Sequence, residues 1–121
     1  MIQNIEKIEY RHGLLEKKKQ PTDLPMKVWR GSQINAEILK SFHNEDILNL
    51  GGTYGDRDIG NPPEYDYLRI ILTDDEVEIE FFNRGISLLT TDNQKYRRIH
   101  RVLCVLDKQS QIEKDNGKKN G

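Results

Sequence analysis

The sequence predicts one small α+β domain, built from an antiparallel β-meander of three to five strands and two amphipathic helices. Residues 65–83 contain two neighbouring segments rich in β-branched and aromatic residues, which is typical of paired strands. Residues 92–108 repeat apolar side chains at helical spacing. A length of 121 residues allows one domain with one modest core.

The two strands of residues 65–73 and 76–83 are expected to form a hairpin that reverses at Asp74 and Asp75. The expected cross-strand pairs are Leu72 with Val77, Ile70 with Ile79, Leu68 with Phe81, and Arg69 with Glu80. This register places all six apolar residues on one face, and a slip of one residue would move half of them to the other face. A four-residue turn over residues 73–76 is an open alternative that leaves the two faces unchanged.

A third strand is expected over residues 86–90, after a second reversal at Arg84 and Gly85. A two-residue loop there would place Leu88 beside Phe81. The sheet would then continue as an antiparallel meander.

A helix is predicted over residues 92–108, because Thr91 and Gln94 have the spacing of a capping box. Its apolar stripe consists of Tyr96, Ile99, Val102, Leu103 and Leu106. This stripe is expected to cover the apolar face of the hairpin. Residues 109–121 lose this periodicity and are expected to form a disordered tail, so that the domain comprises residues 1–108.

The N-terminal half is expected to add one or two strands and the second helix. Residues 1–20 fit a helix through Ile2, Ile5 and Ile8 or a strand through Ile8 and Tyr10, and the strand is favoured. A short strand is predicted at residues 26–30. The second helix is predicted over residues 33–43, capped by Ser32, with an inner stripe of Ile34, Ile38, Leu39 and Phe42.

Residues 51–63 form the one long irregular segment, with four glycines and two prolines. A small enzyme built on this loop would use Tyr54, Asp56, Arg57 and Asp58. The glycines match neither the phosphate-binding Walker pattern nor the dinucleotide-binding pattern. A solvated, self-paired loop is therefore the favoured interpretation.

The residue types that serve catalysis and metal binding are not arranged in a known pattern. His12, His43 and His100 lack the spacing of metal ligands, so neither a metal nor a cofactor is expected. The lone Cys104 lies in the apolar part of the last predicted helix and is expected to be buried and inert. No catalytic residue is nominated, and a protein without enzymatic activity is favoured.

Charge is segregated along the chain although the net charge is only −1. The net charge is +3 over residues 1–30, −9 over residues 31–83 and +5 over residues 84–121. On the last predicted helix, one solvent face gathers four cations, Arg97, Arg98, Arg101 and Lys108. Such a face could contact phosphates, so nucleic-acid binding is the first alternative function.

A protein partner is the leading expectation, because the sheet face opposite the predicted core mixes aromatic and charged residues as interfaces do. The candidate interface residues are Tyr65, Tyr67, Arg69, Ile71, Glu78, Glu80 and Phe82. Cover of this face by the helix at residues 33–43 is the equal alternative. A second copy of the chain is one candidate for this partner.

The location of the protein is expected to be the cytoplasm. The N-terminus carries acidic residues where a secretory signal needs an apolar run, and no stretch is long and apolar enough to span a membrane. No membrane partner is expected. The sequence therefore predicts a small intracellular interaction or regulatory module.

Overall fold

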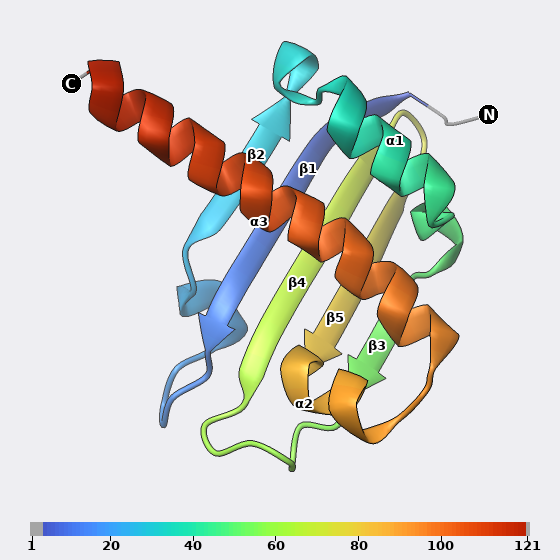
Figure 1. Ribbon diagram of the computed structural model, residues 1–121, viewed down its shortest axis with the longest axis vertical. Coiled ribbons are helices and arrows are strands. Elements are labelled where there is room, and N and C mark those ends of the chain that lie inside the picture. Colours follow the sequence, from blue (N-terminus) through green and yellow to red (C-terminus); the bar gives the residue numbers. More distant parts are fainter. Residues whose placement is uncertain (1–3, 121) are drawn as a thin grey trace.

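The computed structural model describes residues 4–120, and the side chains of residues 4–116. It shows a small single-domain α+β fold with a five-stranded sheet in the order β2-β1-β4-β5-β3 (Figure 1). The strands are β1 (Ile5–Leu14), β2 (Met26–Arg30), β3 (Gly52–Gly55), β4 (Glu64–Leu72) and β5 (Glu76–Phe82). All neighbouring pairs are antiparallel except β3 and β5, which are parallel.

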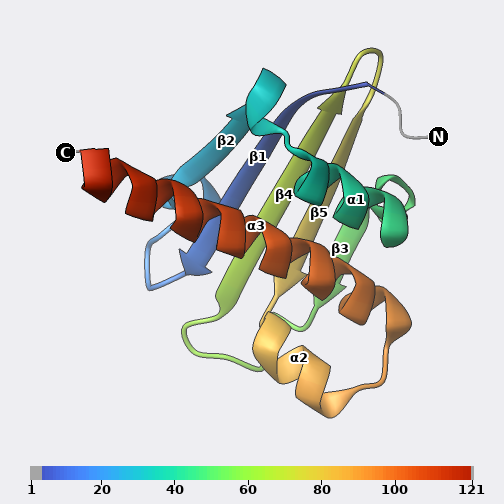
Figure 2. The same cartoon turned by 45° about the horizontal axis from the view of Figure 1, so that its top comes forward.

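Three helices complete the fold, namely α1 (Ala36–Asn44), α2 (Arg84–Thr90) and α3 (Gln94–Asn120). Short 3-10 turns occur at Pro21–Asp23, Gly31–Gln33 and Ile47–Asn49. Helix α3 crosses the sheet diagonally, α1 lies beside it on the same face, and α2 sits at the end of the sheet next to the start of α3 (Figures 1 and 2). The fold therefore has two layers, with the helices on one side.

The core lies between the sheet and helices α1 and α3. Alternation along β4 and β5 directs every second side chain toward the helices, as strand geometry requires. The sheet and helices α1 and α3 contribute the buried core residues Ile8, Tyr10, Trp29, Ile38, Phe42, Leu68, Ile70, Leu72, Ile79, Phe81, Ile99, Val102, Leu103 and Leu106, and the segment after α1 adds Ile47 and Leu50. The predicted apolar stripe of the last helix and the predicted inner face of the hairpin are thus confirmed.

The hairpin between β4 and β5 has the predicted faces but not the predicted register. Leu68 pairs with Ile79, and Arg69 pairs with Glu78, so the pairing is shifted by two residues. The cause is the turn, which closes between Leu72 and Asp75 (N to O, 2.8 Å) and has its tip one residue earlier than expected. A shift of two residues leaves each side chain on its face, because the side-chain period is two.

The third strand predicted at residues 86–90 is wrong, because these residues belong to α2. The edge of β5 pairs instead with β3, which comes from the segment predicted as an irregular loop, and the sheet is mixed rather than a meander. Asn83 has a left-handed conformation (φ 52°) and turns the chain out of the sheet. Gly55 is needed in β3, because a Cβ atom there would collide with the carbonyl oxygen of Phe82.

The N-terminal elements follow the favoured predictions with small shifts. β1 and β2 confirm the two strands, while Ile2 lies outside the described residues. Helix α1 begins after Asn35, not after Ser32, and the Asn35 side chain accepts a hydrogen bond from the backbone N–H of Ile38 at 3.1 Å.

The last helix is longer than predicted. It begins at Gln94, where the Asn93 side chain accepts hydrogen bonds from Lys95 N and Tyr96 N, and it continues to Asn120. Residues 109–120 therefore continue the helix where the sequence indicates a disordered tail. Gln109 is buried here and accepts a hydrogen bond from Asn35 Nδ2 at 2.8 Å, which anchors this turn to the start of α1.

We expect Ile79→Ala and Leu103→Ala each to lower the free energy of unfolding by about 2–5 kcal/mol, because both remove buried methyl groups from a closed core. Denaturant unfolding followed by circular dichroism measures this change. Leu89→Ala is the control, because Leu89 is 88% exposed and should change stability by less than about 0.5 kcal/mol. Losses as small as the control's at both core sites would contradict the packing of α3 on this face.

Candidate functional site

The sheet face opposite the helices, called the outer face below, is left open by α1 and α3. Both helices pack on the inner face, so the alternative in which the helix at residues 33–43 covers the outer face does not hold. The connection between β1 and β2, residues 15–25, folds over one end of it. There Leu15 and Leu24 bury the ring of Tyr65.

The outward side chains of β4 are tied to the glutamates of β5 by diagonal contacts. The hydrogen bonds run from Tyr65 Oη to Glu80 Oε2 (2.6 Å), from Tyr67 Oη to Glu78 Oε2 (2.5 Å) and from Arg69 Nε to Glu76 Oε2 (2.6 Å). Arg69 was predicted to lie opposite Glu80, but it lies opposite Glu78 in the register and its side chain contacts Glu76. These contacts fix the orientation of the side chains on this face.

The β5 side of the outer face is acidic. Burial and the hydrogen bond to a glutamate raise the pKa of both Tyr65 and Tyr67, so the two tyrosines remain neutral donors. A neutral donor does not neutralise the carboxylate charge of Glu78 or Glu80. Glu76, Glu78 and Glu80 together form an acidic row on β5, and among the described residues Arg69 is the one cation that pairs with this row.

Glu9 on β1 completes the contacts of Arg69. Its carboxylate lies 3.1 Å from Arg69 Nη1 and 3.3 Å from Lys7 Nζ. Burial alone would raise the pKa of Glu9, but the hydrogen bonds from Lys7 and Arg69 outweigh this effect and lower it. Glu9 is therefore held in its charged form beside Arg69.

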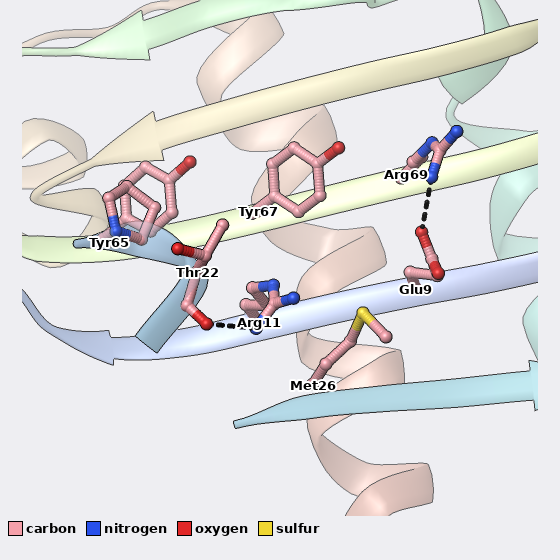
Figure 3. Close-up of a pocket in the computed structure, with 8 residues that line it drawn as sticks. Glu9, Arg11, Thr22, Met26, Tyr65, Tyr67 and Arg69 are labelled. Carbon is pink, nitrogen blue, oxygen red and sulfur yellow. Dashed lines mark hydrogen bonds and ion pairs between the residues drawn. The ribbon is translucent and has the colours of Figure 1, made fainter. Parts of the chain in front are cut away.

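A groove of about 350 Å³ runs over β2, β1 and β4 on the outer face (Figure 3). Its lining combines aromatic, apolar and charged side chains: Glu9, Arg11, Pro21, Thr22, Met26, Tyr65, Tyr67 and Arg69. Arg11 Nη1 donates to the carbonyl oxygens of Thr22 (3.1 Å) and Leu24 (2.5 Å), so it pins the β1–β2 connection over the strand. Met26 stands at the groove with 42% of its surface exposed.

The seven predicted interface residues all lie on the outer face of β4 and β5, and their role in binding stays a prediction. Ile71 and Phe82 are half-buried there. Phe82 packs against Tyr65 with ring centroids 5.1 Å apart, and the guanidinium of Arg57 lies 5.7 Å from its ring centroid.

The four loop candidates for an enzyme do not converge on one pocket. Tyr54 belongs to β3, packs on Phe81 from the inner side and donates its hydroxyl to Leu50 O at 2.8 Å. Asp56 instead closes a turn by accepting from the backbone N–H of Asp58 at 2.8 Å. Arg57 points to the outer face, on the other side of the sheet from Tyr54.

Three of the four predicted nucleic-acid contacts are engaged within the chain. Arg97 pairs with Asp92 at 2.6 Å, and Arg101 pairs with Glu45 Oε1 at 2.9 Å. Arg98 donates to the carbonyl oxygen of Glu45 at 2.7 Å. Lys108, the fourth cation, is exposed. Phosphate contacts would have to displace these internal partners, which weakens the nucleic-acid interpretation.

A buried polar cluster was missed by the sequence analysis. Asp66 of β4 is 1% exposed, and its Oδ1 atom lies 2.8 Å from Tyr10 Oη and 2.8 Å from His12 Nδ1, both on β1. Its Oδ2 atom lies 3.4 Å from Arg84 Nε on α2, and Arg84 Nη2 donates to Asp107 Oδ2 on α3 at 3.1 Å. The cluster therefore joins four elements of the fold.

The charges of this cluster are mutually stabilised. The hydrogen bond to Asp66 raises the pKa of His12, although partial burial acts in the opposite direction. Burial would lower the pKa of Arg84, but Asp66, Tyr10 and Asp107 together raise it. Arg84 is thus a permanent cation beside the buried carboxylate.

A signal for this cluster was present in the strand alternation. Asp66 has the same parity as the core residues Leu68 and Ile70, and His12 has the same parity as Ile8. A charged residue at a core-facing position needs a partner, because an unpaired buried charge is costly. The identity of the partner, Arg84, could not be inferred from spacing.

Cys104 is exposed, contrary to the prediction that it is buried. Its sulfur lies 3.4 Å from Nε2 of His100, one helical turn earlier. Partial burial raises the pKa of the Cys104 thiol and lowers the pKa of His100, so the pair favours neutral forms and not the thiolate that nucleophilic attack requires. Within residues 4–116, no three His, Cys, Asp or Glu side chains are grouped as a metal site.

Comparisons with known proteins assign no family. No protein-family model matches the chain, and no solved structure matches it. A Drosophila melanogaster protein, "Putative inactive polypeptide N-acetylgalactosaminyltransferase 12", is 31% identical over 77 residues, which are 64% of this chain and 14% of that protein. The chain therefore spans only a small part of that relative. None of the helices in the described part of the chain has the length and apolarity needed to cross a membrane.

We expect His12→Gln to destabilise the protein more at about pH 5.5 than at about pH 8.5. The folded pKa of His12 is raised above its ordinary value of 6.5, so its stabilising contribution is complete below that value and is lost as the pH rises through the folded pKa. Denaturant unfolding of wild type and variant at both pH values measures the difference. An imidazole NMR titration that places the pKa of His12 at or below 6.5 would contradict the contact with Asp66.

We expect Arg84→Met to lower the free energy of unfolding by about 3–5 kcal/mol, because it leaves the buried carboxylate of Asp66 without its cation. Adding Asp66→Asn to this variant should recover part of the loss, since the uncompensated charge is then removed. Denaturant unfolding of the two single variants and the double variant measures the coupling. Strictly additive effects would show that the two side chains do not depend on each other.

Proposed function

We propose that the chain is a small protein-interaction module that binds a partner protein through the outer face of its sheet. One observation carries this proposal: the helices leave this face open, and it combines a groove floored by Tyr65 and Tyr67 with the acidic row of β5. Tyrosine, methionine and arginine are the residue types enriched at protein interfaces, and all three line the groove.

The side chains of this face are held in place before any partner arrives. Tyr65 and Tyr67 are fixed by glutamates, and Arg11 is fixed by the carbonyl oxygens of the β1–β2 connection. A partner therefore loses less binding free energy to the ordering of side chains. The outer face is therefore expected to bind as a preformed rigid surface, without a loop of this chain having to fold upon binding.

The chemistry of the face indicates the chemistry of the partner. The acidic row of Glu76, Glu78 and Glu80 faces one cation and would attract lysine or arginine side chains. The groove beside it would receive an apolar side chain between Tyr67 and Met26. A partner segment with both features, one apolar anchor next to basic residues, fits the face best.

We expect the double variant Glu78→Gln and Glu80→Gln to weaken partner binding by about two- to tenfold, because exposed charge pairs contribute modestly. Glutamine keeps an acceptor oxygen for Tyr65 and Tyr67, so the variant removes charge and preserves the hydrogen bonds. The measurement is quantitative affinity capture from extracts of the source cells, followed by titration of the purified partner at two salt concentrations.

The control for this experiment is Glu37→Gln with Glu113→Gln, which removes the same charge from exposed positions on the helix layer. Partners lost with the outer-face variant and kept with the control support the proposal. Partners retained equally by both variants would show that the acidic row does not take part in binding.

A further inference from the structure

A second groove, of about 510 Å³, lies between the β1–β2 connection and the segment of residues 51–63. Four cations line it, Lys17, Lys18 and Lys19 from the first segment and Arg57 from the second. The lysines and Arg57 are about forty residues apart in the sequence and are brought together only by the fold. Two carboxylates, Glu16 and Asp58, also line the groove.

Backbone hydrogen bonds join the two walls of this groove to each other and also close the turn within the lysine wall. The backbone N–H of Leu15 donates to Pro63 O at 2.9 Å, which joins the two segments. The lysine turn is closed by a hydrogen bond from Lys19 N to Glu16 O at 2.8 Å, and Lys18 at its tip has φ 72°. A non-glycine residue in this left-handed region is strained, and such strain is concentrated at functional sites.

The position of Arg57 is set by its neighbours. Its guanidinium lies over the ring of Phe82, and the preceding residue is anchored by a hydrogen bond from Asn83 Nδ2 to Asp56 O at 2.7 Å. Stacking on a ring face leaves the N–H groups at the edge of the guanidinium free for a ligand.

The four groove cations differ from most arginines of the protein in having no ion pair. Arg69, Arg84, Arg97, Arg98 and Arg101 each lie within 4.0 Å of a carboxylate of the chain. In the part of the chain whose side chains are described, the groove lysines and Arg57 have no such contact. The groove therefore has more positive charge than its own carboxylates neutralise.

We propose that this groove binds a soluble ligand that carries more than one phosphate group. Lysine ammonium groups act as point charges for phosphate, and the arginine guanidinium can donate two parallel hydrogen bonds to its oxygens. The two carboxylates set a limit on affinity, because they repel the same oxygens. The proposal is independent of the protein partner on the outer face.

Titration with inorganic pyrophosphate at about 50 mM salt tests this proposal, with ¹⁵N chemical shifts and calorimetry as readouts. Binding should shift the amide signals of residues 16–20 and 57–58 and should weaken as salt is added. The double variant Lys18→Gln and Arg57→Gln should weaken binding by at least about tenfold, because two charge-assisted contacts are lost. The charge-matched control is Lys40→Gln with Lys95→Gln, exposed on α1 and α3, and it should bind as wild type does.

A second variant makes the opposite prediction. Asp58→Asn with Glu16→Gln should strengthen pyrophosphate binding severalfold, because both carboxylates line the groove and repel the ligand. Among the described residues the Asp58 side chain makes no hydrogen bond or ion pair that the substitution would remove, since the turn uses its backbone N–H. Absence of binding at low salt, equal weakening by the control variant, or equal affinity for citrate, which carries carboxylates in place of phosphates, would each overturn the proposal.

Discussion

The buried carboxylate of Asp66 imposes the strongest constraint on the fold. A charge placed inside a protein costs several kcal/mol unless it is paired and hydrogen-bonded, and Asp66 obtains its partners from two other elements, β1 and α2. Arg84 reaches it from the first turn of α2, where the chain has left the sheet directly after β5. The left-handed turn at Asn83 accomplishes this, and α2 begins at Arg84. The edge of β5 pairs with β3, and the sheet is mixed because these two strands run parallel.

The outer face of the sheet is open because all helical cover lies on the inner face. Helices α1 and α3 both bury apolar stripes, and both find their partner on the inner face. The outer face is stabilised by short contacts between neighbouring strands, in which Tyr67 and Arg69 each bind a glutamate of β5. A surface of this kind is ordered and still accessible. The proposed role in protein binding depends on that combination.

The connection between β1 and β2 links the two proposed binding regions. Its Pro21 and Thr22 border the groove on the outer face, and its lysine turn forms one wall of the cationic groove. Leu24 buries Tyr65 and so fixes the segment on the sheet. Arg11 adds hydrogen bonds to two of its carbonyl groups. The segment is thus part of the packed structure and not a free loop, which gives both grooves defined walls.

The sequence by itself determined which side chains of the hairpin and of the last helix face the core, because apolar residues recur there with the periods of a strand and a helix. The faces of β4 and β5 and the stripe of α3 follow from this. It could not determine the register, since a shift of two residues preserves every face. Nor could it identify β3, whose four residues include two glycines, or α2, which is too short for its period to distinguish helix from strand. The tertiary structure decided those elements through long-range contacts, among them the pairing of β3 with β5 and the contact of Asp66 with Arg84.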